Sequence, residues 1–432
     1  MNLYLFNAND SAATYGIGSY LKELTKALEG AGINTRIVHL HSVRPDFEIV
    51  KTGQVENWYI PEVRNQNTFS GSIQMLEDYY RNVIYLLRLH IKETKDLVFH
   101  FNYNQSQFLA KELKKIFDCK TVATVHFMKW ALALHGNLSR LHTLKSQPEN
   151  QRNSFEQILY ITDEYENLLY KEVDRVIALS GYMKRFLCSE YRLDPNKIAV
   201  IPNGLDDTDS EIETGRDVLR QRWHISANEF LILFAGRLNP VKGLEFLIKA
   251  FRKVLEIIPE CRLIVAGNGN YDVYFQESKD ICTKITFTGL LTKKELQELY
   301  QIADVGVAPS LYETFGYVAV EMMMQGLPIV TTASSGLNEV VDDTCGLKVP
   351  VIEHPDKVET DTDLLAEKIL YLLQHPLEAK QMGQNGRTRY LQNYSQEIFR
   401  KNMLDFYNSL VMFNSALMLS MPGKRANCAK KI

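Results

Sequence analysis

Cysteine is scarce in this sequence: the chain has 6 cysteines, and no two of them form a C-x-x-C pair. Scattered thiols are typical of proteins from reducing compartments, and they argue against a disulfide framework or a cysteine-based zinc site. No run of about 18 apolar residues occurs, so the sequence predicts no membrane-spanning helix. The opening residues, MNLYLFNAND, have no basic segment ahead of their short apolar run. We therefore expect a strand there instead of a signal peptide, in a cytoplasmic protein.

The chain also lacks a strong charge of either sign. Its formal net charge is −3 at pH 7, so there is no electrostatic reason to expect a nucleic-acid partner. Hydrophobic residues make up 45% and charged residues 23% of the chain, which is ordinary for a globular protein. At 432 residues the chain is too long for one compact domain and suits two domains of roughly 150–200 residues.

Short apolar runs alternate with segments of helical periodicity along the whole chain. This alternation predicts an α/β protein with parallel sheets covered by helices on both faces. We expect two doubly wound, Rossmann-like domains, 1–205 and 206–394, facing each other across a cleft and joined by the polar stretch LDDTDSEIETGRD. The last part, 395–432, is predicted to hold a helix from Ser395 to Leu410 that crosses back to the first domain, followed by a basic tail.

Two carboxylates flank an apolar stretch in SLYETFGYVAVEMMMQGLPIV. The pattern predicts a strand at Val305–Ala308, a loop, and a helix whose first turn falls near Phe315–Tyr317, where free N–H groups favour an anion. Glu313 precedes this helix, and Glu321 lies about 7–8 Å beyond its start. Carboxylates accept hydrogen bonds from vicinal hydroxyls, so the pair suits two hydroxyl-bearing groups flanking a diphosphate. The alternative is that Glu313 caps the helix and Glu321 is a solvated surface residue.

Two cations follow another predicted strand end, in FAGRLNPVKG. The strand ends at Gly236, and Arg237 and Lys242 lie in the loop that leads into the next helix. Together they can neutralise a diphosphate leaving group without a metal ion, Arg by planar bidentate contacts and Lys as a point charge. The alternative is an ordinary solvated surface loop.

Three further features are weaker signals. Gly16 and Gly18 lie at a strand-to-helix turn, where backbone can approach a phosphate closely, although glycine also serves ordinary turns. His126 is expected at the end of a strand that runs from Thr121, at the crevice where ligands bind, although a lone histidine often only satisfies local hydrogen bonds. The D-T-D run at 207–209 has the form of a divalent-cation motif, but we interpret it as part of a solvated linker, and we expect no metal site.

The order of these features resembles the retaining glycosyltransferases of family 4, the GT-B-fold group that includes sucrose and bacterial surface-polysaccharide transferases. The match covers most of residues 174–345 and is thinner in the first domain. It is carried by the glutamate pair with seven residues between and by these segments: DRVIALSGYMKRFL (174–187), IAVIPNG (198–204), GRLNPVKG (236–243), FTGLLTKKELQELYQIADVGVAPS (287–310), ETFG (313–316) and EMMMQGLPIV (321–330).

The resemblance implies a catalytic set and a donor-binding set. Arg237 and Lys242 are expected to bind the donor's diphosphate. Glu313 and the backbone N–H groups of Phe315 and Gly316 are expected to hold the donor sugar. The second domain is accordingly expected to bind the nucleotide sugar, and the first to face the acceptor.

The remaining donor contacts follow from the same resemblance. Glu321 would bind the ribose, and the segment around Leu290 would lie against the base. Gly16 would line the phosphate site, and Gly18 and Gly236 complete the donor-binding set.

His126 would approach the donor sugar and completes the catalytic set. Here Phe127 follows it, where many members of the family have an acidic or polar residue.

The resemblance therefore implies transfer of a sugar from a nucleotide-diphosphate sugar to a hydroxyl of a saccharide or lipid-linked saccharide, with retention and without a cofactor, in polysaccharide or glycoconjugate biosynthesis. Two enzymatic alternatives on the same scaffold are a nucleotide-sugar epimerase and a phosphorylase, the latter normally with a lysine-bound pyridoxal cofactor. A non-catalytic nucleotide-sugar-binding subunit is the third.

Two segments have open interpretations. The tail NSLVMFNSALMLSMPGKRANCAKKI pairs an apolar stretch with a basic end, which suits weak peripheral contact with the inner membrane face; a docked helix followed by a disordered tail is the alternative. The aromatic residues between 51 and 103 either belong to the core or stack on an acceptor sugar; they are Trp58, Tyr79, Tyr80 and Tyr103.

Overall fold

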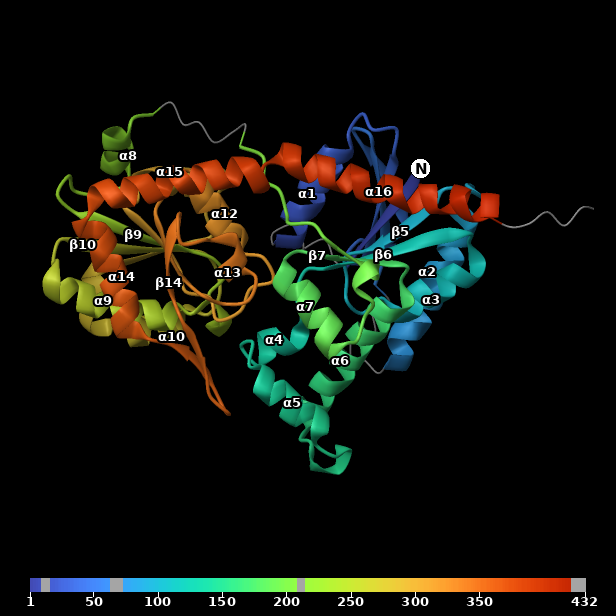
Figure 1. Cartoon of the computed structure of the whole chain (residues 1–432), viewed down its shortest axis with the longest axis horizontal. Helices are drawn as coiled ribbons and strands as arrows, with labels where there is room; N and C mark the ends of the chain where they lie inside the picture. The colour runs from blue at the N-terminus through green and yellow to red at the C-terminus, as the bar shows by residue number, and fades with distance from the viewer. Residues whose placement is uncertain (9–15, 63–72, 208–213, 421–432) are drawn as a thin grey trace, which may run out of the picture.

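Two lobes joined by one long helix make up the computed structural model (Figure 1), which describes residues 1–8, 16–62, 73–207 and 214–420, with side chains as far as Leu410. The first lobe is built on an 8-stranded sheet in the order β3-β4-β2-β1-β5-β6-β7-β8. All neighbours are parallel except β3 and β4. The strands are β1 (Asn2–Ala8), β2 (Asn34–Ser42), β3 (Glu48–Thr52), β4 (Val55–Pro61), β5 (Leu97–Phe101), β6 (Cys119–Val125), β7 (Arg175–Ala178) and β8 (Ile198–Val200).

The second lobe is built on a 6-stranded parallel sheet in the order β11-β10-β9-β12-β13-β14. A short antiparallel pair, β15 and β16, extends from it toward the first lobe. The strands are β9 (Phe230–Ala235), β10 (Cys261–Ala266), β11 (Ile285–Gly289), β12 (Val305–Ala308), β13 (Ile329–Thr332), β14 (Gly346–Val349), β15 (Val351–Glu353) and β16 (Val358–Thr360).

Helices cover both sheets, as expected for strands that are buried on both faces. The first lobe contributes α1 (Gly16–Leu28), α2 (Ile73–His90), α3 (Gln107–Ile116), α4 (Lys129–Ala133), α5 (Leu138–Ser146), α6 (Ser154–Glu172) and α7 (Gly181–Glu190). The second contributes α8 (Arg216–Arg222), α9 (Leu244–Ile257), α10 (Tyr271–Glu277), α11 (Lys293–Ile302), α12 (Tyr317–Met324), α13 (Leu337–Val340), α14 (Thr362–Gln374) and α15 (Pro376–Asn393).

The last helix, α16 (Gln396–Ser420), starts at the second lobe and runs over α1 of the first (Figure 1). Gln396 Nε2 donates to the carbonyl of Glu23 at 2.8 Å. Further along, the Tyr407 hydroxyl lies 2.7 Å from His100 Nδ1, and both side chains are 0% exposed. These contacts confirm the predicted crossover helix and the predicted architecture of two facing Rossmann-like units.

The strands beside the cavity follow the sequence prediction closely. β12 has the predicted bounds, whereas β9 ends at Ala235, one residue before the predicted end at Gly236, and β6 ends at Val125, so that His126 is the first residue after the strand. Between 51 and 103 the structure has part of the β3–β4 hairpin, α2 and β5. Trp58, Tyr79 and Tyr80 are at most 6% exposed, so these three belong to the core.

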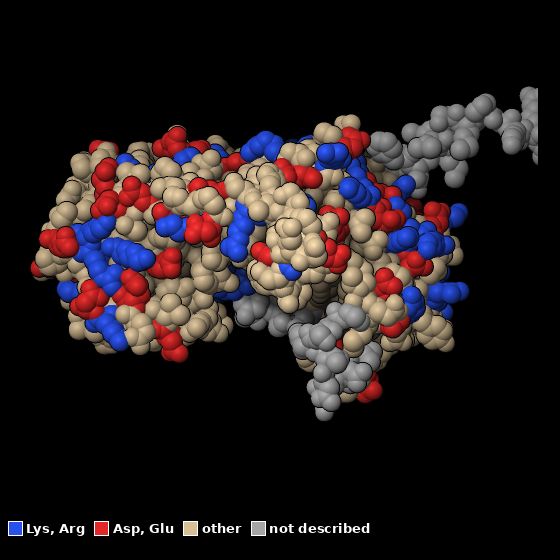
Figure 2. Space-filling model, turned by 90° about the horizontal axis from the view of Figure 1, so that it is seen from below, with Lys and Arg blue, Asp and Glu red and all other residues tan. Residues whose placement is uncertain are grey.

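Within the described ranges, no helix is long and apolar enough to span a bilayer. Lys and Arg side chains are intermixed with Asp and Glu over the face shown in Figure 2.

In the D-T-D run, Asp207 forms an ion pair with Arg387 at 2.6 Å, whereas Asp209 lies outside the described residues, as do the tail residues 421–432. The membrane contact expected of the tail therefore stays a prediction.

Candidate active site

A cavity of about 490 Å³ lies between the two lobes, where loops after parallel strands of both sheets converge. All of the predicted site residues line it except Gly18, which lies within α1. Those that line it are Gly16, His126, Gly236, Arg237, Lys242, Leu290, Glu313, Phe315, Gly316 and Glu321. Residues more than 300 positions apart in the sequence, Gly16 and Glu321, are thus brought to one site.

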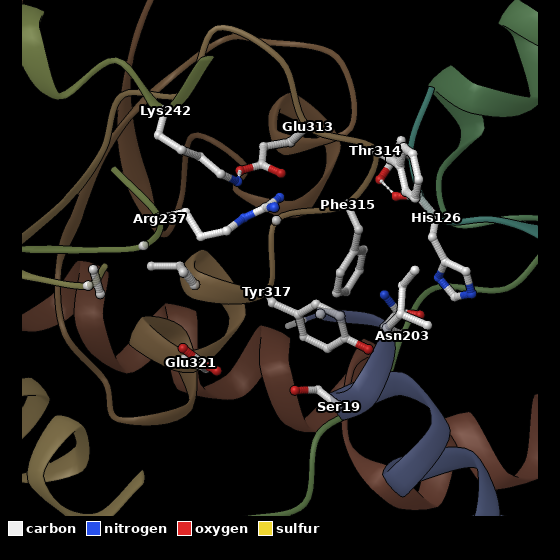
Figure 3. Close-up of a pocket in the computed structure, with 18 of the residues that line it drawn as sticks. Ser19, His126, Asn203, Arg237, Lys242, Glu313, Thr314, Phe315, Tyr317 and Glu321 are labelled. Atoms are coloured by element: carbon white, nitrogen blue, oxygen red, sulfur yellow. Dashed lines mark hydrogen bonds and ion pairs between the residues drawn. The ribbon is translucent and has the colours of Figure 1, made fainter. Parts of the chain in front are cut away.

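One wall of the cavity carries both predicted cations. Arg237 and Lys242 come from the loop after β9 and point toward Glu313, which lies on the loop after β12 (Figure 3). Lys242 Nζ forms an ion pair with Glu313 Oε1, and Ser310 Oγ donates to the same oxygen at 3.0 Å. The carboxylate therefore has a partner in the protein and does not cap the helix with its side chain.

The Glu313 loop is fixed by a segment that the sequence reasoning did not single out. The backbone N–H of Glu313 donates to Ser335 Oγ at 2.8 Å, and this hydroxyl donates to the Glu313 carbonyl at 2.6 Å. A Cβ on Gly336 would lie 2.3 Å from the carbonyl oxygen of Thr314, so only glycine allows this approach. The run Ala-Ser-Ser-Gly after the predicted strand at Ile329 was the available signal.

Glycine also lets two neighbouring strand ends meet beside the cations. Gly236 follows β9 with φ 147°, and Gly267 follows β10 with φ 154°. A Cβ on Gly267 would lie 1.7 Å from the Gly236 carbonyl oxygen. The backbone itself therefore forms this part of the cavity wall, which suits close approach of a phosphate.

Helix α12 presents its N-terminus to the cavity. It begins at Tyr317, after Gly316 in the left-handed region at φ 111°, and no side chain caps it. Its free N–H groups and positive dipole end therefore face the same space as the two cations, an arrangement that favours an anion.

Glu321 lies farther along α12 and also lines the cavity. The Tyr300 hydroxyl donates to its Oε2 at 2.8 Å. Burial raises the pKa of Glu321, while the hydrogen bond from Tyr300 and the nearby Lys293 lower it. The Glu321 side chain is therefore fixed at the cavity wall by the hydrogen bond from Tyr300 and is not a solvated surface residue.

The first lobe supplies the opposite wall. Burial lowers the pKa of His126 to about 3, so its imidazole is neutral at physiological pH. His126 Nε2 lies 2.9 Å from Asn102 Oδ1, and Tyr20 packs edge-on against the ring at 4.5 Å between centroids. A neutral, fixed imidazole can take part in hydrogen bonds but does not supply charge to a phosphate.

The two lobes meet directly at the cavity. Thr314 Oγ1 donates to the His126 carbonyl at 2.6 Å (Figure 3). Ser180 Oγ, at the start of α7, donates to the Thr314 carbonyl at 2.9 Å. Thr314 belongs to the quoted ETFG run, but its bridging position could not be read from the sequence because both partners lie more than 100 residues away.

Asn203 is another lining residue that the sequence reasoning did not assign. It is 1% exposed, and its Oδ1 has no hydrogen-bond partner in the described chain. Its signal was the Pro-Asn-Gly run in the segment IAVIPNG (198–204). The described residues contain no cluster of three or more His, Cys, Asp or Glu side chains arranged to hold a metal ion.

Family models match both halves of the chain. Residues 14–209 match the model described as Glycosyltransferase Family 4. Residues 215–389 match the model described as Glycosyl transferases group 1. The two matches together include every predicted site residue.

Individual proteins are similar to this chain at the level of 24–35% sequence identity. An uncharacterized glycosyltransferase of Methanocaldococcus jannaschii is 35% identical over 185 residues, 41% of this chain and 46% of that protein. The trehalose synthase of Pyrococcus horikoshii is 24% identical over 428 residues, 94% of this chain and 89% of that protein. The matched region thus spans less than half of the first relative and most of the second.

A solved structure shows the same fold along nearly the whole chain. The sucrose-phosphate synthase of Thermosynechococcus elongatus superposes with a TM-score of 0.75 at 22% identity, covering 96% of this chain and 100% of that one.

Proposed function

The chain belongs to the group 1, family 4 glycosyltransferases of GT-B fold, and we propose that it transfers a sugar from a nucleoside-diphosphate sugar to a hydroxyl group with retention of configuration, without a metal ion or bound cofactor. One observation carries this proposal. Arg237, Lys242 and the N-terminus of α12 face a single cavity that also holds Glu313 and Glu321.

The donor's diphosphate is proposed to lie between the cations and α12. Arg237 offers a planar pair of N–H donors, and Lys242 a point charge. Lys242 is already oriented by its ion pair with Glu313, so the cation and the carboxylate are positioned together. Positive groups fixed before the reaction stabilise the charge that develops on the leaving phosphate, which is usually the largest catalytic term.

Glu313 and Glu321 are proposed to bind hydroxyl groups on either side of the diphosphate. Glu313 accepts from the donor sugar and Glu321 from the ribose, since carboxylates accept from paired hydroxyls. In the proposed reaction the bond between the anomeric carbon and the phosphate oxygen breaks while the acceptor hydroxyl oxygen bonds to that carbon from the same face. The acceptor's proton passes to the leaving phosphate oxygen, so neither glutamate acts as a nucleophile.

The acceptor is proposed to lie at the carboxyl edge of the first sheet. Asn7 is the next-to-last residue of β1, Asn102 directly follows the adjacent strand β5, and both are at most 3% exposed. Asn7 Oδ1 and Asn102 Nδ2 are buried without a hydrogen-bond partner in the described chain. An amide acceptor and an amide donor on adjacent strand ends, with Asn102 bonded to His126, suit a polyhydroxylated acceptor. The names of the similar proteins, trehalose synthase and sucrose-phosphate synthase, also point to sugars.

A thermal-shift panel tests the donor class. Uridine, guanosine and adenosine diphosphates and NAD are compared, with and without magnesium, on the native chain and on Lys242→Ala. A ligand at about 100 times its dissociation constant adds roughly 2.7 kcal/mol of stability, which is several degrees. We expect one nucleoside diphosphate to stabilise the native chain, independently of magnesium, and to lose this effect in Lys242→Ala.

Lys111→Ala is the matched control, because Lys111 is an exposed lysine on α3 that does not line the cavity. Stabilisation by NAD alone, or by no nucleotide, would contradict the proposal. Donor turnover without any acceptor would favour an epimerase instead, and binding without turnover across many acceptors would favour a non-catalytic subunit.

A further inference from the structure

Glu166 is a buried carboxylate on α6, behind the first-lobe wall of the cavity. Its side chain is 0% exposed. Oε1 accepts hydrogen bonds from Asn104 Nδ2 at 2.9 Å and from the backbone N–H of Lys129 at 3.3 Å. Oε2 is buried and has no hydrogen-bond partner in the described residues. Because a buried carboxylate is costly, its presence calls for an explanation beyond packing.

Asn104 connects this carboxylate to the segment that follows β6. Its Nδ2 also donates to the carbonyl of Phe127 at 2.7 Å, and the residue is 1% exposed. Glu166 Oε1 therefore holds the Lys129 end of the Phe127–Lys129 tripeptide directly and the Phe127 end through Asn104.

The front of the same segment faces the cavity. His126 and Phe127 both line it, and the His126 carbonyl accepts the hydrogen bond from Thr314 of the second lobe at 2.6 Å. Thr314 directly follows Glu313. A displacement of the segment would therefore move the His126 wall and the contact that sets the two lobes against each other.

We propose that Glu166 is a positioning residue for the sugar transfer proposed above, on which this inference rests: acting through Asn104 and Lys129, it holds residues 126–129 where they meet Thr314. Glu166 touches neither substrate. The ionised carboxylate holds the segment more firmly, because hydrogen bonds to a charged acceptor are roughly twice as strong as neutral ones. A proton on Oε2 removes this charge while Oε1 keeps its two donors.

The surroundings of Glu166 place the protonation of its carboxylate near neutral pH. Burial raises the pKa of Glu166 to about 7, although the hydrogen bonds from Asn104 and Lys129 lower it. Asp163, one turn earlier on α6, raises this pKa and is itself ion-paired with Lys145 at 2.7 Å; the Lys129 ammonium lowers it. The other titratable neighbours have pKa values raised far above neutral and stay uncharged: Tyr170, Tyr191 and Tyr312.

The first test is the pH profile of kcat and of the donor KM in the native chain and in Glu166→Gln, which keeps an acceptor oxygen but cannot ionise. We expect native kcat to fall as pH drops through about 7, the pKa of Glu166. The kcat of the variant should not show this fall at acid pH. At pH 8 it should be about 10-fold below the native value, because a set of charge-assisted hydrogen bonds is weakened, and at low pH the two values should converge. The donor KM should hardly change, because Arg237 and Lys242 are untouched.

Glu164→Gln, two residues earlier on α6 and with its carboxylate only half-buried, is the control and should keep the native profile. Asn104→Ala should lower kcat at pH 8 as Glu166→Gln does, and the double variant should lose little more, because both act on one segment. Additive losses, or an acid limb that persists in Glu166→Gln, would overturn the inference while leaving the proposed function in place.

A second readout needs no substrate. The chain has 3 tryptophans, and Trp130 directly follows Lys129. In the full chain labelled with 5-fluorotryptophan, the ¹⁹F line that Trp130→Phe removes should titrate with a midpoint near pH 7, the pKa of Glu166, and should not titrate in Glu166→Gln. An unshifted line, or the same titration in both, overturns the inference. Absence of turnover in a native chain whose Trp130 line titrates as expected would instead contradict the proposed function.

Discussion

Lys242 and Glu313 form an ion pair across two loops of the second sheet, one after β9 and one after β12. The pair lines the cavity and is half-buried, with side-chain exposures of 19% and 18%. Each member therefore limits where the other can lie. Because the sugar and the diphosphate are proposed to bind these two groups, the ion pair fixes the spacing between the two donor subsites.

Removing the charge of Glu313 should lower kcat without lowering the affinity for the nucleoside diphosphate. Glu313→Gln keeps the size of the side chain but loses the ion pair, and the reacting sugar loses its charged acceptor. We expect kcat to fall about 10²–10³-fold, the range for loss of one positioned electrostatic group. The affinity for the nucleoside diphosphate, measured by titration calorimetry, should stay close to that of the native chain. Glu256→Gln, an exposed position on α9, is the control; an equal loss there, or loss of nucleotide binding alone, would contradict the prediction.

The hydrogen bond from Tyr300 should lower the pKa of the Glu321 carboxyl group and so favour its ionised form. Burial already raises the pKa of Glu321, and the Tyr300 hydrogen bond lowers it, so Tyr300→Phe should raise it further. If the ionised form binds the ribose hydroxyls, nucleoside diphosphate affinity should fall as pH falls, and in the variant this fall should begin at higher pH. The expected loss at neutral pH is about 10-fold, equivalent to one hydrogen bond to a charged group. Titration calorimetry at several pH values measures it.

Tyr85→Phe is the control for this prediction, because Tyr85 is 61% exposed on α2. A pH dependence that is the same in Tyr300→Phe and in the native chain would show that Glu321 does not titrate with binding.

Asn102→Ala should affect the acceptor more than the donor. Its Oδ1 lies 2.9 Å from His126 Nε2, and its Nδ2 is buried without a partner among the described residues, so the substitution removes a donor from the proposed acceptor wall. We expect the acceptor KM to rise about 10-fold, the usual effect of one hydrogen bond, with donor affinity retained. Steady-state kinetics with each substrate varied in turn would measure both, and a rise confined to the donor KM would contradict the placement of the acceptor.

Glu166→Gln should change stability in a pH-dependent way opposite to its effect on rate. The native pKa is raised from 4.5 to about 7, so the protonated form is favoured by folding. That contribution is fully present below about pH 4.5 and is lost as pH rises through 7. Relative to native, the variant should therefore gain stability between pH 5 and 8, on the order of 3 kcal/mol at most. Thermal unfolding across this range measures it; a constant difference between the two chains would contradict the pKa direction.

Sequence patterns predicted the strands best and the contacts between distant segments least. Strands such as Val305–Ala308 are buried on both faces, so their apolar runs give bounds that match the structure. The cations and glutamates were found because strand-end loops in such sheets meet at one edge. Ser335, Thr314 and Glu166 were missed because their roles depend on partners far away in the sequence, and no local periodicity reports such partners.

Several hydrogen bonds join the two lobes in addition to the shared helix α16. On one side the Gly181 N–H of α7 donates to Glu339 Oε2 at 2.7 Å. On the other side, where the β15–β16 pair reaches α5, Asn137 Nδ2 donates to the His354 carbonyl at 2.6 Å and the Ser139 N–H donates to Glu353 Oε1 at 2.7 Å.

The Thr314–His126 bond adds a further contact between the lobes, at the cavity itself. A movement of one lobe away from the other would have to break these hydrogen bonds. The lifetime of a bound nucleotide would then depend on how often all of these bonds open at once, as much as on its own affinity for the cations.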